Sequence, residues 1–212
     1  LYGGFDGKMA PKTNFKISVN YSTVKNRPLY YLFKHLYDES MPLSYITDNT
    51  FDVIYDNLDI LKFNLEIFHA SFGKVNLLLS GNYYVYDMKT MQEAWNLPDW
   101  DAKLSLEYKA SEQLSFSTNL FFMSKRRALI YSYPGEDPRP LSNAELFELE
   151  NLQTEIHTLE PIIDLNFNAD YKITGKLSVF ASLNNFAFHK YQHWIGYPVQ
   201  SFNIMGGVSY AF

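Results

Sequence analysis

The chain has 212 residues, with 23 acidic and 18 basic side chains, a formal net charge of −5 and no cysteine. The lack of cysteine excludes disulfides and cysteine-ligated metal sites, and the negative charge argues against a generic nucleic-acid-binding protein. A content of 17 Tyr, 17 Phe and 3 Trp argues against disorder. The longest unbroken apolar run is Leu29–Phe33, whereas a membrane-spanning helix needs roughly 20 such residues.

Apolar and polar residues alternate along most of the chain, which is the pattern of β-strands with one apolar and one polar face. A short opening strand is expected at Tyr2–Lys8. Eight further segments follow in chain order: Phe15–Ser22, Leu61–Ile67, Val75–Val85, Trp100–Ala110, Leu114–Phe122, Ile163–Ile173, Leu177–Asn184 and Phe202–Phe212. The sequence therefore predicts an all-β protein of about nine strands.

Short and long connections between these strands take turns. The short ones lie around Ala10–Asn14, Phe72–Lys74, Ser111–Gln113 and Thr174–Lys176. The long ones are Phe33–Asn49, Met91–Pro98, Pro134–Glu160 and His193–Gln200. This arrangement gathers the tight hairpins at one end of the sheet and the loops at the other, as in antiparallel up-and-down transmembrane β-barrels with short periplasmic turns and long extracellular loops.

The long loop 134–160 contains a capping-box pattern at Ser142–Glu145. Leucine and isoleucine side chains follow at helical spacing, at Leu146, Leu149, Leu152 and Ile156. We expect a short amphipathic helix in an acidic, solvated loop that covers the mouth of the barrel. Binding of a substrate or a cation by this loop is the alternative.

The two faces of the strands indicate their surroundings. The apolar face is continuous across at least seven strands and ends in aromatic residues, which fits lipid flanked by interfacial aromatic girdles. The polar face would then line a wet lumen. Its lumen-facing candidates are Lys103, Glu107, Asp164, Asn166, Asn168 and Asp170. A soluble barrel or sandwich that binds a ligand also alternates and remains the alternative.

Nine is an odd number, and bacterial single-chain barrels usually have an even number of strands. Counted back from Phe212 at the periplasmic end, Tyr2–Lys8 runs down into the first short turn and needs an upstream partner. We expect residues 1–212 to form a single segment of a larger barrel. A misjudged strand at Tyr2–Lys8 is the alternative.

The segment Leu177–Phe212 reads LSVFASLNNFAFHKYQHWIGYPVQSFNIMGGVSYAF. Its paired asparagines, Lys-Tyr, Gly-Tyr-Pro, Gly-Gly and terminal Phe resemble the closing hairpin of TonB-dependent outer-membrane receptors of Bacteroidetes-type bacteria. The stretch PIIDLNFNADYKITGKLSVF, residues 161–180, is similar to the preceding hairpin of that family. The strong resemblance covers about 50 residues, and the remaining strands and loops match more loosely.

This resemblance implies a barrel in the bacterial outer membrane that imports a scarce nutrient with energy from the TonB system. It also implies outer-membrane lipid, upstream barrel strands and a plug domain as partners, although no residue here matches the plug or the TonB-contacting box. A structural or assembly barrel without transport is the second hypothesis. The last strand resembles the signal read by the barrel-assembly machinery, carried by Ile204, Val208, Tyr210 and Phe212, and an ordinary closing strand is its alternative.

No spacing in the sequence singles out a catalytic set, a cofactor site or a metal site. His189 and His193 are four residues apart, but a third ligand is not near, whereas catalytic zinc sites typically have three protein ligands. The cluster Lys125-Arg126-Arg127 leaves a strand at the loop side, where it could contact lipid phosphates or lie in solvent. Aromatic and methionine side chains that interrupt the polar face are expected to pack inside the barrel rather than to bind a ligand: Tyr84, Tyr86, Phe121, Met123, Phe180 and Phe186.

Overall fold

The structure is a computed structural model that describes residues 1–35, 50–71, 73–133 and 153–212. Every strand or helix assigned in these ranges is a β-strand. None of the described segments is a helix long and apolar enough to cross a membrane. The strands are β1 (Tyr2–Ala10), β2 (Thr13–His35), β3 (Thr50–Ser71), β4 (Val75–Met88), β5 (Trp100–Lys109), β6 (Leu114–Met123), β7 (Arg126–Tyr133), β8 (Gln153–Leu159), β9 (Ile162–Lys172), β10 (Leu177–Asn184), β11 (Gln192–Trp194), β12 (Tyr197–Pro198) and β13 (Asn203–Tyr210).

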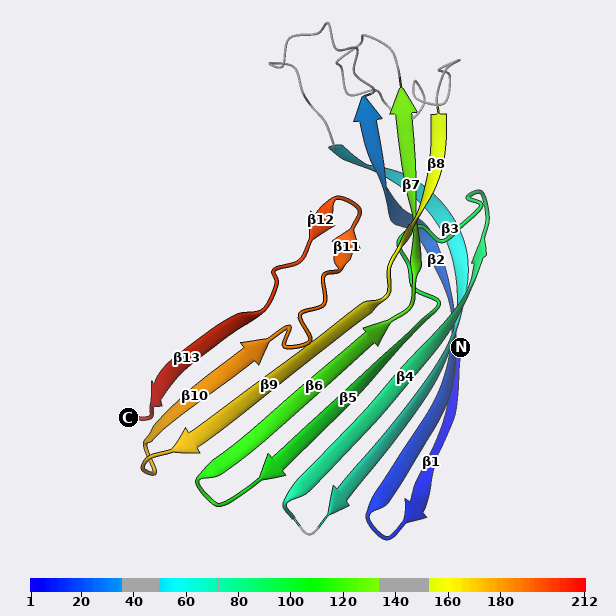
Figure 1. The fold of residues 1–212 in the computed structure, drawn as a ribbon. Coiled ribbons are helices and arrows are strands. Elements are labelled where there is room, and N and C mark those ends of the chain that lie inside the picture. The colour runs from blue at the N-terminus through cyan, green and yellow to red at the C-terminus, as the bar shows by residue number, and fades with distance from the viewer. Residues whose placement is uncertain (36–49, 72, 134–152) are drawn as a thin grey trace, which may run out of the picture.

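Eleven strands form one sheet, in the order β13-β10-β9-β6-β5-β4-β3-β2-β7-β8, and β1 pairs with β2. All nine predicted strands are present, as β1 to β6, β9, β10 and β13 (Figure 1). Where these nine strands pair with one another they are antiparallel, and the tight turns that join them gather at one end of the sheet. The predicted antiparallel up-and-down arrangement is therefore confirmed for these strands.

Four strands were not predicted, and they all lie at the loop side of the sheet. The hairpin β7–β8 leaves the sheet between β6 and β9, and β7 pairs in parallel with the upper end of β2, where Leu32 lies opposite Ile130 (Figure 1). The helix expected to reach Ile156 is wrong at that residue, because Ile156 lies within β8. The capping box Ser142–Glu145 lies outside the described residues.

The register of the sheet aligns its apolar face into a band. Leu79, Leu104, Leu120 and Leu165 are direct cross-strand neighbours in the middle of this face. Two aromatic rows flank them, one toward the loops at Tyr21, Phe63, Tyr83, Trp100 and Phe122, and one toward the turns at Phe15, Tyr108, Phe116, Tyr171 and Tyr210.

The height of this band fits a bilayer. Trp100 and Tyr108 lie on β5 and belong to different aromatic rows. The strand between them extends about 26 Å at ~3.3 Å per residue. A tilt of ~40° reduces the height to about 20 Å, near the ~25 Å apolar band of outer-membrane barrels. The large side chains on this face are exposed or only partly buried in the isolated chain; Leu79, for example, is 38% exposed.

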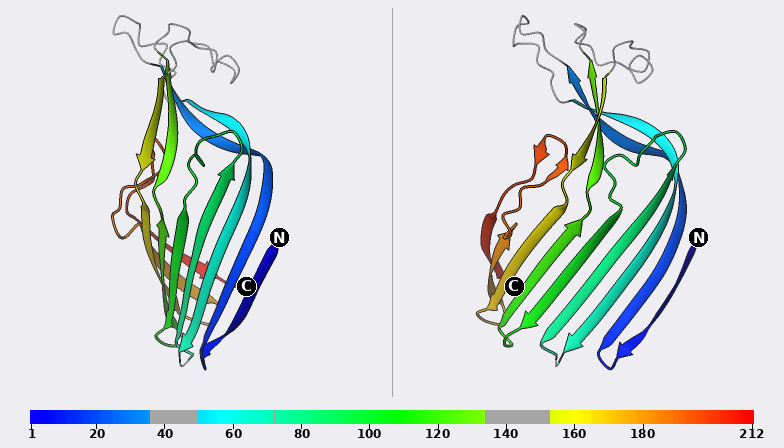
Figure 2. Two further views of the ribbon diagram at one scale, coloured as in Figure 1. Left: turned by 90° about the vertical axis from the view of Figure 1, so that its right-hand side faces the viewer. Right: turned by 45° about the vertical axis from the view of Figure 1, so that its right-hand side comes forward.

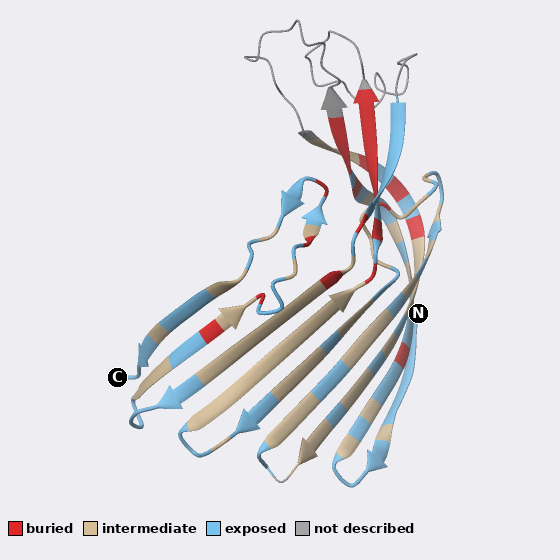
Figure 3. Cartoon of the chain, in the orientation of Figure 1, coloured by how far each residue is buried: buried red, intermediate tan, exposed pale blue. Residues whose placement is uncertain are grey.

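The buried core lies beyond the band, on the loop side (Figure 3). The residues with almost no exposure include Leu29, Leu32, Leu58 and Ile130. One cluster combines the upper parts of β2 and β3 with β7 and the β4–β5 loop, and a second combines β2, β7 and β8 with Ile195. We call this loop-side body, built from residues 27–35, 50–56, 89–97, 126–133, 153–159 and 185–200, the cap.

The sheet is curved into a trough rather than closed into a barrel (Figure 2). Within the described residues, β1 pairs only with β2, and β13 pairs only with β10. At the β13 edge, a Cβ atom placed on Gly207 would lie only 2.6 Å from the nearest atom of the Phe180 ring. Gly207 thus makes room for an aromatic side chain across the strand pair.

Candidate functional site

The polar face of the trough carries a chain of hydrogen-bonded side chains from strand to strand. The Asn64 amide donates to the Asn82 side-chain oxygen at 3.0 Å, and the Asn82 amide donates to the Asp101 carboxylate at 2.8 Å. The Tyr84 hydroxyl donates to the other oxygen of Asp101 at 2.9 Å. Ser18 extends this ladder toward β1 with a longer contact of 3.5 Å to Asn64. Such a face suits a hydrated lumen, because its polar groups are hydrogen-bonded to one another while all of them except the buried Ser18 stay partly accessible.

The register brings the predicted lumen residues onto this same face. Lys103, Phe121 and Asp164 lie in one cross-strand row, and Glu107, Ser117 and Asn168 lie in another. Phe121 thus interrupts the polar face, as its sequence position indicates. The remaining lumen candidates share this face by the same register: Asn166 opposite Asn119, and Asp170 opposite Ser115. A role in contacting solute stays a prediction for all six.

The connection between β10 and β13 crosses the loop-side end of this face. The backbone N–H of Asn185 donates to the Asn166 side-chain oxygen at 3.0 Å. Further along, Tyr191 is buried, and burial together with the nearby Asp164 carboxylate raises the pKa of its hydroxyl to about 12. Two lumen candidates therefore hold the final loop in place.

Asp56 fixes the β4–β5 loop to the upper part of β3. Its carboxylate is 4% exposed and accepts hydrogen bonds from the Thr90 and Met91 backbone N–H groups, at 3.1 and 2.8 Å. The Thr90 hydroxyl donates a further bond of 2.7 Å. Burial acts to raise the pKa of Asp56, but these bonds stabilise the charged form and hold the pKa below its ordinary value.

The predicted basic cluster has other partners than lipid at two of its three positions. The Arg126 guanidinium is buried and donates to the backbone carbonyls of His193 and Gln192, at 2.7 and 2.6 Å. Arg127 forms an ion pair with Glu93 of the β4–β5 loop. Lys125 is exposed and stays a candidate for a lipid phosphate. The two arginines instead join β7 to the loops on either side.

The β11–β12 hairpin packs across the mouth onto β2 and β3. The Trp194 ring lies edge-on to Tyr30, with ring centroids 5.1 Å apart, and contacts Phe51 at 6.1 Å. Tyr197 also contacts Phe51, at 5.2 Å. Side chains of the final loop and of the upper parts of β2 and β3, which are distant in the sheet order, are thus in contact.

The two histidines considered as metal ligands flank an aromatic ring. The rings of His189 and His193 lie 6.0 and 5.5 Å from the Tyr191 ring, measured between centroids. Burial and the charge of Arg126 lower the pKa of His193. The described residues contain no group of three His, Cys, Asp or Glu side chains placed to hold a metal ion.

The predicted assembly signal lies on β13 and just beyond it. Ile204, Val208, Tyr210 and Phe212 are all more than half exposed. Val208 and Tyr210 lie opposite Val179 and Leu177 on the apolar face. This placement is compatible with recognition by an assembly partner, which stays a prediction.

Sequence reasoning missed the residues that organise the cap, above all Asp56, Glu93, Trp95 and Asn96. Asn96 has a positive φ of 62° and donates from its side chain to the Tyr30 carbonyl at 2.7 Å. The signal available was an aspartate at an otherwise apolar strand position together with an Asn-Leu-Pro stretch in the loop. Neither feature indicates the hydrogen-bond partner, which lies 34 residues away for Asp56 and 66 residues away for Asn96.

Solved structures with the same fold are receptors and transporters of the outer membrane. The pyoverdine outer membrane receptor FpvA from Pseudomonas aeruginosa superimposes with a TM-score of 0.65 at 16% identity, covering 100% of this chain and 29% of the receptor. The fold is that of an outer-membrane receptor barrel. The copper transporter OprC gives 0.63 at 12% identity, covering 100% and 30%. The siderophore receptor PirA from Acinetobacter baumannii gives 0.63 at 11% identity, covering 100% and 31%.

The chain spans less than a third of the length of these receptors. The fold agrees with the barrel portion of TonB-dependent receptors that the C-terminal residues resemble, and the solved proteins are receptors or transporters rather than enzymes. No protein-family model and no curated protein matches the sequence.

Proposed function

We propose that this chain is the C-terminal barrel portion of a receptor in the outer membrane of a Gram-negative bacterium, which takes up a scarce nutrient in a TonB-dependent manner. The observation that carries the proposal is the pairing of two faces on one sheet. An aliphatic band between aromatic rows faces one way, and the ladder through Asn64, Asn82 and Asp101 faces the other. A soluble sheet protein has no need of a band matched to a bilayer.

The open edges of the sheet favour a segment of a larger receptor barrel over a complete small barrel. A sheet in lipid cannot leave backbone N–H and C=O groups unpaired. The outer edges of β1 and β13 have no partner among the described strands. We infer that both edges pair with further strands of the same receptor, and that the wider lumen holds a plug domain, as in 22-stranded outer-membrane transporters.

The cap supports a role in recognising solute. It places a folded body with its own apolar core at the loop-side mouth, above the polar face, through contacts from β2, β7 and the β4–β5 loop. FpvA is described with bound pyoverdine and OprC as a copper transporter.

The test uses the full-length receptor in its native bacterium. TonB-dependent uptake predicts that the receptor fractionates with the outer membrane, migrates differently on gels before and after boiling, and binds the purified periplasmic domain of TonB. Deletion of TonB should abolish uptake of radiolabelled ferric siderophores or copper that the receptor supports. A folded outer-membrane barrel that neither binds TonB nor changes uptake would favour the structural or assembly barrel. A chain that stays monodisperse without detergent would favour the soluble binder.

A further inference from the structure

The tight turns place lysines at matching positions of the sheet. At the turn end of four strand pairs, the register continues by one residue pair that is joined by a backbone hydrogen bond of 2.8 to 3.0 Å. These four pairs are Lys12 with Ala70, Lys74 with Lys109, Gln113 with Lys172, and Lys176 with Ala211. Five of the eight residues are lysine and none is acidic. All five lysines are exposed, and together we call them the lysine rim: Lys12, Lys74, Lys109, Lys172 and Lys176.

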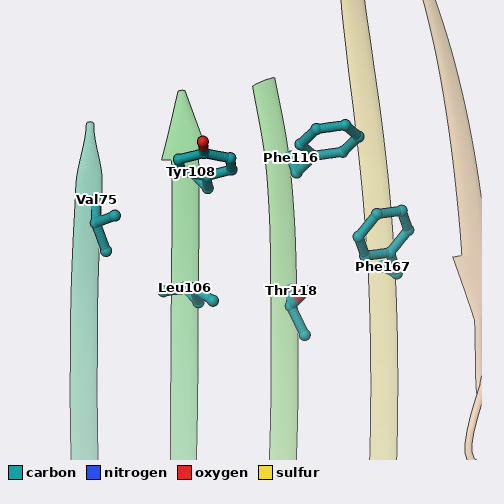
Figure 4. A pocket seen from close by; sticks show the side chains of 6 residues that line it. All are labelled: Val75, Leu106, Tyr108, Phe116, Thr118 and Phe167. Atoms are coloured by element: carbon teal, nitrogen blue, oxygen red, sulfur yellow. The ribbon is translucent and has the colours of Figure 1, made fainter. Parts of the chain in front are cut away.

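The register places the lysine rim on the polar, lumen-facing side of the sheet. Val75 and Tyr108 are cross-strand partners, and both line an apolar groove on the lipid-facing side of these strand ends (Figure 4). Successive residues of a strand face opposite sides of a sheet. The next pair toward the turns, Lys74 and Lys109, therefore lies on the lumen side. The same alternation places the rest of the lysine rim on this side: Lys12, Lys172 and Lys176.

The positive charge of the lysine rim is not balanced within the described part of the chain. Lys74 and Lys109 lie directly opposite each other, and like charges at such positions destabilise a sheet. Among the described residues, neither of them forms an ion pair, and the same holds for Lys172 and Lys176. The acidic residues in the turns and within two residues of the five lysines are only three: Glu107, Glu112 and Asp170. A chain with a net charge of −5 thus gathers an excess of positive charge at one end of its lumen face.

We propose that the lysine rim docks an acidic surface of the plug domain, at the turn-side end of the lumen. The proposal rests on the receptor function proposed above, and it adds the residues and the charge of the contact. Lipid does not fit this position, because the rim lies on the side of the sheet that faces away from the lipid. Aspartate and glutamate side chains of the plug do fit, since they remove the repulsion between the lysines and fix how the two surfaces align. The cap lies at the other end of the sheet (Figure 1), so the rim holds the plug at its periplasmic end and leaves its outer surface to the solute.

Zero-length crosslinking identifies the partner of the rim directly. A water-soluble carbodiimide joins an ammonium group to a carboxylate that is already in contact with it. The full-length receptor in detergent is treated with this reagent and digested, and its crosslinked peptides are identified by mass spectrometry. We expect crosslinks from Lys74, Lys109 or Lys172 to aspartate or glutamate residues of the plug. Lys25, which is exposed at the bulge of β2 toward the loop side, is the control and should give none. A rim that crosslinks only to barrel carboxylates, only to a copurified protein or not at all overturns the proposal.

Removal of charge tests the contact through its dependence on salt. In the full-length receptor at low salt, the double variant Lys74→Gln, Lys109→Gln should speed hydrogen exchange in the crosslinked plug segment about tenfold, the order of effect of two partly exposed ion pairs. At about 1 M salt, charges are screened beyond ~3 Å, so the difference should disappear. Lys25→Gln removes the same kind of charge and should have no effect at either salt concentration. An unchanged exchange rate at low salt, or a difference that persists at high salt, overturns the charge contact.

Failure of the rim can be told apart from failure of the proposed function. A receptor that reaches the outer membrane with a plug in its lumen, but gives neither the crosslinks nor the salt-dependent exchange, overturns the lysine rim alone. A barrel that has no plug, or that does not reach the outer membrane, overturns the proposed function and the rim together.

Discussion

Replacing Asp56 with alanine tests how the cap is held together. The Asp56 carboxylate is 4% exposed and accepts three bonds from the β4–β5 loop: from two backbone N–H groups, of Thr90 and Met91, and from the Thr90 hydroxyl. Alanine removes the acceptor and leaves these donors facing an apolar cluster that contains Trp95. We expect the loop over residues 89–97 to detach while the membrane strands stay folded.

The size of the effect follows from the number of bonds lost. Hydrogen bonds to a charged group contribute about 1.5 kcal/mol each at the lower end, which gives about 4.5 kcal/mol for three. Water that reaches the freed groups recovers part of this, so a net loss of about 3 kcal/mol is expected. That loss raises the open population of the loop roughly 150-fold.

Hydrogen exchange at the Thr90 and Met91 amides measures this opening in the intact receptor. Asp56→Ala should speed exchange at both amides by about two orders of magnitude, and Asp56→Asn, which keeps one acceptor oxygen, should have a smaller effect. Asp87→Ala is the control, because the Asp87 carboxylate is exposed and forms an ion pair with Lys89 at the start of the same loop. Unchanged exchange in Asp56→Ala would refute the view that this carboxylate holds the loop.

Three further perturbations test other parts of the structure. Acid should release the β4–β5 loop as the pH falls below 3.8, the ordinary pKa of the Asp56 carboxyl. Because the pKa of Asp56 is lowered in the folded protein, the charged carboxylate stabilises the fold above pH 3.8, and this stability is lost as Asp56 is protonated. Pepsin cleavage within residues 89–97 measures the release of the loop. Arg126→Leu removes two bonds to backbone carbonyls and should expose β11–β12 to proteolysis, whereas Lys125→Leu should not. Leu79→Arg, in the middle of the lipid face, should cost about 2–4 kcal/mol and impair assembly. Ser80→Arg, one residue along on the lumen face, should be tolerated, and equal defects in heat-modifiable migration would contradict the assignment of faces.

The membrane strands could be predicted because each is governed by one local rule. Lipid on one side and a wet lumen on the other impose a period of two, and this period is visible in β5, β9 and β13 without any knowledge of neighbours. The ends of the strands could not be predicted as well from this period. β2 and β3 continue above the band to His35 and from Thr50, where Leu29–Phe33 is an unbroken apolar run and Tyr31, Leu32 and Phe33 are buried in succession.

The cap could not be predicted because its strands depend on distant partners. β7 buries Ala128, Leu129 and Ile130 in succession, so it shows no alternation. β8 lies in a segment whose leucines and Ile156 are spaced as on a helix, yet it pairs with β7. Arg126 reads as a charged strand end, since nothing near it in sequence reveals carbonyl acceptors 66 and 67 residues away. Local pattern fixes neither the pairing nor the burial of such residues.

A bulge in β2 explains how one strand serves both the membrane and the cap. Below the bulge, Ile17 and Tyr21 face lipid; Val24 then pairs with Leu58 but Arg27 with Asp56, so β2 carries one extra residue. The extra residue reverses the facing of every later side chain. Odd-numbered apolar residues therefore turn from lipid to the interior of the cap at Leu29, Tyr31 and Phe33, and Asn26 adopts the positive φ of 51° at the switch. An uninterrupted period of two would assign these residues to the lipid face, whereas the chain builds a core with them at the mouth.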